Sequence, residues 1–189
     1  MNGDTPLPFP LGHGSVTVTS RRGRAVHIRH LAAEDAERLV DLFNHLSPET
    51  RRMRFFSPRT DTPDDVLWPE AVRLADINPL VEAALIATVP EDGQENAVGV
   101  ARLIREAEGA SQAEVAIVLR DDYQGEGLGT VLFDLLVQVA MVRGLKRLWA
   151  VSLAENVAFH RLVRNSGLPF TSQTLRGETT TTITLSDES

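Results

Sequence analysis

Cysteine is absent from the 189-residue chain, which excludes disulfide bonds and thiol catalysis. The five histidines are scattered and show no metal-ligand spacing, so we expect no metal site. No apolar stretch reaches the roughly 18 residues of a membrane-spanning helix, and the N-terminus lacks the apolar centre of a signal peptide. We therefore expect a cytoplasmic protein that makes no use of a membrane.

Positive charge is also scarce, since 19 lysines and arginines face 26 aspartates and glutamates and leave a net charge of -7. Such a surface repels phosphate backbones, so we expect no binding to nucleic acid, whereas a cationic amine suits it better. Residues 1–14 are rich in proline and glycine and are predicted to be irregular. Residues 15–189 have the length of a single domain, and we expect a monomer or a homodimer.

Apolar runs and helical periodicities alternate along the chain and predict an α/β sheet with helices on both faces. Strands are expected at 16–18, 25–29, 81–89, 97–105, 113–119, 147–153, 170–175 and 179–185. Helices are expected over 36–46, from about 62, over 128–142 and from 156. Thr62 is predicted to cap the second helix with Pro63 at its first position, and Pro69 to kink or interrupt it. Trp68 and Trp149 are expected in the core.

The glycine-rich segment 124–130, Gln-Gly-Glu-Gly-Leu-Gly-Thr, is the most informative stretch of the sequence. It joins the expected strand 113–119 to the expected helix 128–142, in the order strand, turn, helix. Glycines let the backbone turn sharply and approach a ligand closely. The first N–H groups of a helix have no partners inside it and attract an anion. The segment therefore predicts a phosphate-binding site.

Three kinds of glycine-rich loop compete for this segment. A dinucleotide fingerprint would require glycine at Thr130 and an earlier place in the chain, and a nucleotide P-loop would require lysine at Gly129. A helix start without a ligand is the remaining alternative, although three alternating glycines would then lower stability without a function. The pattern Gln-x-x-Gly-x-Gly on Gln124, Gly127 and Gly129 resembles the pyrophosphate loop of the GNAT N-acetyltransferases, which bind acetyl-CoA.

A second segment carries the same resemblance. Residues 156–167 are similar to the family's second motif, in which an asparagine opens a short helix that ends in glycine. The resemblance extends over roughly residues 26–185. It implies the GNAT fold, with a mixed central sheet of about six or seven strands and helices on both faces, and acetyl-CoA as cosubstrate without a metal.

The resemblance also implies the residues of a cofactor site. Backbone groups of the strand before the loop would pair with the pantetheine arm, and one N–H there would polarise the thioester carbonyl. The diphosphate would rest on the glycine loop, and Asn156 would contact the cofactor while it caps its helix. The implied cofactor-binding residues are Ile117, Val118, Leu119, Gln124, Gly125, Glu126, Gly127, Leu128, Gly129, Thr130 and Asn156.

Two further segments resemble the bacterial protein lysine acetyltransferases, which acetylate acyl-CoA synthetases. These are residues 46–56 and the run Ala-Glu-Val-Ala at 113–116, where that branch carries its catalytic glutamate. Glu114 is therefore the candidate general base, and the alternative is a strand-end glutamate that faces water. Arg51, Arg52 and Arg54 have two interpretations of equal weight, a solvated helix face or a role in binding.

One position departs from the family. Many members carry a tyrosine seven residues after the motif asparagine, as the acid for the departing thiolate, and here that position is Val163. His160 is nearby but is expected on the surface, and Leu168 replaces the usual aromatic residue after the glycine. The protein lysine branch often lacks this tyrosine too.

The favoured function is acetyl transfer to a protein lysine by direct attack in a ternary complex. The alternatives are a small-amine acetyltransferase and an acyl-CoA sensor without catalysis.

Overall fold

The computed structural model describes residues 14–56, 62–91 and 93–185, so most of the predicted irregular segment 1–14 lies outside the described residues. The strands are β1 (Ser15–Thr19), β2 (Ala25–His30), β3 (Glu82–Glu91), β4 (Gln94–Arg105), β5 (Gln112–Leu119), β6 (Arg147–Leu153), β7 (Phe170–Leu175) and β8 (Glu178–Thr184). The helices are α1 (Ala36–Asn44), α2 (Pro48–Phe55), α3 (Asp64–Ala75), α4 (Leu128–Val142) and α5 (Val157–Asn165). Two short 3-10 helices, η1 (Ala33–Asp35) and η2 (Asp121–Tyr123), precede α1 and the glycine loop.

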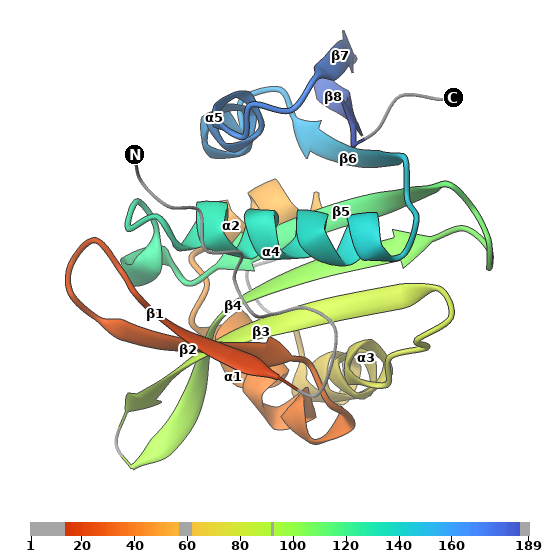
Figure 1. Cartoon of the computed structure of the whole chain (residues 1–189). Coiled ribbons are helices and arrows are strands. Elements are labelled where there is room, and N and C mark those ends of the chain that lie inside the picture. The colour runs from red at the N-terminus through yellow and green to blue at the C-terminus, as the bar shows by residue number, and fades with distance from the viewer. Residues whose placement is uncertain (1–13, 57–61, 92, 186–189) are drawn as a thin grey trace, which may run out of the picture.

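All eight strands form one sheet in the order β1-β2-β3-β4-β5-β6-β8-β7 (Figure 1). Neighbouring strands are antiparallel except for β5 and β6, which are parallel. The expected α/β class and the mixed sheet are confirmed. The expected number of about six or seven strands was too low, because both strands of the N-terminal hairpin and both strands of the C-terminal hairpin join the sheet.

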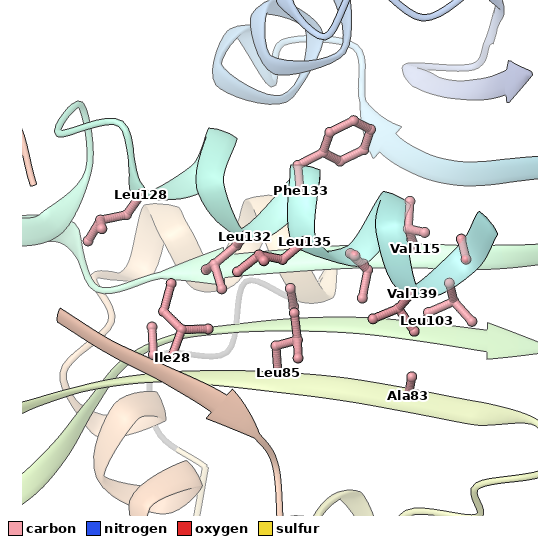
Figure 2. Packing of buried hydrophobic residues seen from close by; sticks show 14 of the residues in the cluster. Ile28, Ala83, Leu85, Leu103, Val115, Leu128, Leu132, Phe133, Leu135 and Val139 are labelled. Carbon is pink, nitrogen blue, oxygen red and sulfur yellow. The ribbon is translucent and has the colours of Figure 1, made fainter. Parts of the chain in front are cut away.

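The two faces of the sheet carry separate apolar clusters. Helix α4 covers one face with a row of leucines, which pack against side chains of the central strands (Figure 2). Helix α1 covers the other face, where Leu42 and Leu46 pack with Ala84 and Ile86. Each fully buried leucine in these layers contributes about 1.5–3 kcal/mol to folding. Because side chains alternate along a strand, β3 supplies Leu85 to one cluster and Ile86 to the other.

The two parallel strands at the centre of the sheet diverge. The register between β5 and β6 contains only the pairs Gln112–Arg147, Ala113–Leu148 and Glu114–Trp149 within the described chain. Beyond these pairs the two strands separate, while β6 remains paired with β8 along its other edge over its whole length (Figure 1). The backbone of β5 from Val115 onward therefore borders an opening rather than a neighbouring strand.

Helix α3 differs from its prediction. It begins at Asp64, its cap residue is Pro63, and no side chain caps it, so the predicted cap at Thr62 was wrong. Pro69 lies inside the helix without interrupting it. Leu67, Ala71 and Ala75 are buried at helical spacing on one side, and this packing holds the helix together across the proline.

The two tryptophans do not serve the core as predicted. Trp68 is 50% exposed, because it lies beside the buried positions of α3 rather than among them. Trp149 is only partly buried, on the opposite side of β6 from the buried Leu148 and Ala150. The prediction was therefore wrong for Trp68, and Trp149 is partly buried without belonging to either apolar cluster.

Candidate active site

A cavity of about 590 Å³ occupies the opening between β5 and β6. Its walls come from the two strands, α2, the glycine loop, α5 and Arg21 in the turn between β1 and β2. The structure brings most of the predicted site residues to this one cavity. The predicted residues that line it are Glu114, Ile117, Val118, Leu119, Gln124, Gly125, Gly127, Gly129, Thr130 and Asn156.

The glycine loop leads directly into α4 at the floor of this cavity. Gly127 is the cap residue with φ 90°, and Gly125 has φ 73°, a conformation that residues with a side chain rarely adopt. The first helical hydrogen bond is donated by Val131 to the Gly127 carbonyl. No side chain caps the helix, and its first turn contains no acidic residue. The N–H groups of 128–130 are therefore available to an anion, and the loop fits a diphosphate.

Two predicted residues do not line the cavity with their side chains. The Leu128 side chain is buried in the core, so only its backbone belongs to the helix start. The Glu126 carboxylate is buried too and accepts hydrogen bonds from Arg24, one of them 3.2 Å long. These bonds lower the pKa of Glu126. The Glu126 side chain therefore anchors the loop, and its assignment to cofactor binding stays a prediction that concerns the backbone of this residue.

A network of charges surrounds this anchor. The Arg24 guanidinium stacks on the Tyr123 ring, 3.3 Å from its centroid. Arg120 donates two hydrogen bonds to Glu91, of 2.8 and 2.7 Å, and these lower the pKa of Glu91 to about 2. The network joins the turn between β1 and β2, the end of β3 and the segment before the glycine loop. It therefore holds the glycine loop in place on the side of the N-terminal hairpin.

The other side of the loop is tied to α2. Gln124 Nε2 donates to Thr50 Oγ1 and to the Leu119 carbonyl, each over 3.1 Å. Asp121 accepts hydrogen bonds from the Ser47 N–H at 2.8 Å and from the hydroxyls of Ser47 and Thr50 at 2.6 and 2.7 Å. Burial raises the pKa of Asp121, but these hydrogen bonds outweigh it and the pKa is lowered. Gln124 therefore acts at least in part by fixing α2 and β5 to the loop.

Glu114 lies where β5 and β6 begin to separate. It pairs in register with Trp149 and lines the cavity, whereas its neighbour Val115 is buried in the core beneath α4. The side chain is half-buried, which differs from a strand-end glutamate that simply faces water. Glu114 thus stands at the end of the cavity where β5 begins, whereas the glycine loop follows the other end of this strand.

The three arginines of α2 have different surroundings. The Arg51 guanidinium lies 4.4 Å from the centroid of the Phe43 ring, and Arg52 pairs with Glu49 at 2.9 Å and with Glu155. Arg54 lines the cavity with Glu114. Burial lowers the pKa of the Arg54 guanidinium, and the negative charge of Glu114 acts in the opposite direction. A structural role thus explains Arg51 and Arg52, and Arg54 alone of the three faces both the cavity and the candidate base.

Helix α5 closes the remaining wall. The Asn156 side chain accepts a hydrogen bond of 3.0 Å from the Phe159 N–H, so the predicted helix cap is confirmed. Val163 is buried in the core and has no proton to give. His160 is half-buried beside the Phe159 ring and does not line the cavity. Sequence reasoning missed the other cavity residues that carry polar groups, which include Arg21, Thr50, Ser152 and Arg161.

Within the described ranges, no group of three or more potential metal ligands comes together. None of the described helices is long and apolar enough to cross a membrane.

Comparison with known proteins identifies the class to which this architecture belongs. The sequence model of the acetyltransferase (GNAT) domain matches residues 25–169. A Pseudomonas aeruginosa protein named as an acetyltransferase is 38% identical over 140 residues, which are 74% of this chain and 73% of the relative. The acetyltransferase Pat of Mycolicibacterium smegmatis is 30% identical over 165 residues, 86% of this chain but only 44% of Pat. The chain therefore belongs to the GNAT family and is an N-acetyltransferase.

Solved structures agree with this assignment. The GNAT domain of S. lividans PAT has a TM-score of 0.77 and 25% identity, over 92% of this chain and 98% of that domain. The Vibrio cholerae spermidine N-acetyltransferase, solved with CoA and spermine, shares the fold with a TM-score of 0.61 at 19% identity, over 84% and 93% of the two chains. Membership of the family implies acetyl-CoA as the acyl donor, which the uncapped helix start at the cavity floor fits.

Proposed function

We propose that this enzyme transfers an acetyl group from acetyl-CoA to the side-chain amine of a lysine in a cytoplasmic protein. The observation that carries the proposal is one cavity with an anion-binding helix start at one end and Glu114 at the other. The similarity of residues 46–56 and 113–116 to bacterial protein lysine acetyltransferases supports a protein acceptor. The relatives named Pat and PAT support it further.

Each part of the cavity has a role in this proposal. Acetyl-CoA, when bound, supplies a thioester activated for transfer. The N–H groups of Leu128, Gly129 and Thr130 bind its diphosphate, with Gly125 and Gly127 giving the approach that a side chain would block. Backbone groups of Ile117, Val118 and Leu119 hold the pantetheine arm, and one N–H of this strand donates to the carbonyl oxygen as charge develops there. Asn156 contacts the cofactor from the start of α5.

Glu114 is proposed to take the proton of the incoming ammonium. A carboxyl group with a pKa of ~4.3 and a lysine with a pKa of ~10.4 differ by about 6 units, or about 8 kcal/mol. Complete direct transfer from a solvated lysine is therefore unfavourable. Entry of the amine into a half-buried cavity lowers its own pKa and reduces this difference. A water molecule between the two groups supplies a second route for the proton. The neutral amine attacks the thioester carbon, the C–S bond breaks, and the CoA thiolate leaves and takes its proton from solvent.

Two other functions fit the same cavity. A small amine would occupy the acceptor end without a protein surface, as in a spermidine N-acetyltransferase. An acyl-CoA sensor would bind the cofactor without turnover, and Val163, with no proton to donate to the thiolate, is the residue that favours it.

Thiol release from acetyl-CoA tests the proposal. The purified chain is given lysine peptides derived from acyl-CoA synthetases, and spermidine in parallel. We expect turnover with the peptides, and exclusive turnover with spermidine would assign the small-amine function instead. Binding of CoA without turnover of any amine would reject catalysis.

Glu114→Gln separates an enzyme from a sensor. Loss of a general base lowers kcat by about 10²–10⁴-fold, while the affinity for CoA, measured by isothermal titration calorimetry, should be unchanged. Glu108→Gln removes the same charge from an exposed turn and is the matched control. A Glu114→Gln enzyme with the wild-type kcat across the pH range would contradict the role of this residue.

A further inference from the structure

The turn between β1 and β2 lies against the glycine loop, although more than a hundred residues separate them in sequence. The Arg21 N–H donates to the Glu126 carbonyl over 3.0 Å. Arg24, at the end of the same turn, holds the Glu126 carboxylate and stacks on Tyr123. Ser20 and Gly23 close the turn with a backbone hydrogen bond of 2.8 Å. The N-terminal hairpin is thus fixed at the place where the diphosphate is proposed to bind.

The side chain of Arg21 runs alongside Gly127. A β-carbon built at Gly127 would lie 3.3 Å from Arg21 Nε, 3.7 Å from its Cγ and 3.8 Å from its Cδ. Arg21 lines the cavity, and no other described residue pairs with its guanidinium by an ion pair or a side-chain hydrogen bond. Its neighbour Arg22 is 72% exposed, does not line the cavity, and lies 3.6 Å from the Glu126 carboxylate. Arg21 therefore borders the cavity in which the diphosphate is proposed to bind, whereas Arg22 lies outside it.

The other described arginines near the glycine loop are paired with carboxylates or lie elsewhere in the cavity, which leaves Arg21 as the cation beside the loop. Arg24 and Arg120 are already paired with Glu126, Glu91 and Asp122, so they offer no free positive charge to a ligand. Of the other arginines that line the cavity, Arg54 faces Glu114 at the acceptor end and Arg161 is carried by α5. A helix start provides N–H groups and a partial positive charge, but a diphosphate carries full negative charges.

From this geometry we infer that Arg21 binds the diphosphate of CoA, so that the N-terminal hairpin forms one side of the cofactor site. The inference rests on the proposed use of the glycine loop for CoA. It also assigns a second reason for glycine at 127, because a side chain there would meet Arg21 and push it away from the ligand. Since Arg21 is exposed, its contribution will be screened by salt.

Calorimetric titration of the full chain tests the inference with CoA and dephospho-CoA as ligands. We expect Arg21→Ala to weaken both by about tenfold at low salt, because a charge-assisted contact to the diphosphate is lost. Arg22→Ala, which removes the same charge one residue away, should change either affinity by less than twofold. Arg21→Lys should restore part of the loss. The steepness of the salt dependence should fall in Arg21→Ala only.

A second readout uses acetyl-pantetheine, which lacks the nucleotide and the diphosphate. Arg21→Ala should leave kcat/KM for this short donor unchanged while it raises the KM for acetyl-CoA. An equal loss with both donors would show a general distortion and overturn the inference. A loss confined to CoA and absent from dephospho-CoA would place Arg21 at the 3′-phosphate and overturn it too. Failure of the wild-type chain to bind CoA would instead reject the proposed cofactor site itself.

Discussion

Gly99→Ala is a substitution for which the structure predicts an effect on both stability and cofactor binding. Gly99 in β4 pairs directly with Leu119, the last residue of β5. A β-carbon at this position would lie 2.4 Å from Leu119 Cδ2, 3.1 Å from the Val118 carbonyl oxygen and 3.4 Å from Leu132 Cδ1. Carbon atoms pack at roughly 3.5–4.0 Å, so the Leu119 methyl must retreat by about 1 Å.

The Leu119 side chain can retreat toward the cavity. Leu132 and the rest of the core beneath α4 are fully buried, whereas Leu119 borders the cavity. Overpacking costs about 1–3 kcal/mol, and replacing glycine within a strand returns about 0.5–1 kcal/mol. At the middle of these two ranges the net loss is about 1 kcal/mol, which should lower Tm by about 2–4 °C for a chain of this length. The displaced side chain should also narrow the path of the pantetheine arm and raise the KM for acetyl-CoA.

Thermal unfolding followed by circular dichroism, together with steady-state kinetics, checks both effects. The double variant Gly99→Ala/Leu119→Ala is the decisive comparison, because removing the leucine removes the clash. We expect the double variant to recover acetyl-CoA binding relative to Gly99→Ala alone. A Gly99→Ala protein with wild-type Tm and KM would refute the reasoning, and so would a double variant that binds acetyl-CoA no better than the single one.

Two further outcomes are expected. The pairing with Arg120 holds the pKa of Glu91 at about 2, well below the ordinary ~4.3. The ionised Glu91 therefore stabilises the fold above pH ~4.3, and this contribution to the free energy of unfolding is lost as the pH falls toward about 2. Glu91→Gln should therefore flatten the stability profile in this range, measured by urea unfolding at stepped pH, and an unchanged slope would contradict the assignment. Asn156→Ala should cost about 1 kcal/mol through loss of the helix cap, seen as a lower Tm, and should raise the KM for acetyl-CoA. Asn156→Ser keeps a capping oxygen, so a raised KM at wild-type Tm would separate the cofactor contact from the cap.

Local patterns explain the parts of the fold that were predicted correctly. The run of Ala113–Leu119, the glycines after it and the helical spacing from Leu128 each depend on neighbouring residues alone, and the observed β5, loop and α4 follow them closely. The cap at Asn156 is local in the same sense. The cavity could be predicted only through the family resemblance, because the divergence of β5 and β6 is a property of register between distant segments.

The features that were missed or wrongly predicted have a common physical origin in contacts that are distant in sequence. The anchoring role of the Glu126 side chain was not predicted, because its carboxylate is paired with Arg24, 102 positions earlier. Arg21 lies between the expected strands 16–18 and 25–29, and nothing near it in sequence indicates a glycine loop beside it. The burial of Trp68 depended on which side of α3 meets α1, and helical spacing alone did not decide this.

The short seam between β5 and β6 also divides the molecule mechanically. Three residue pairs of the described chain connect the part formed by β1–β5 to the part formed by β6, α5, β7 and β8, and buried side chains of the second part, including Leu148, Val163 and Ile183, join the apolar cluster of the first. A ligand wedged between the strands would bond to both parts at once and act as a removable cross-link. Amide exchange in β6 and α5 should then slow when CoA is added, even at positions that never touch it.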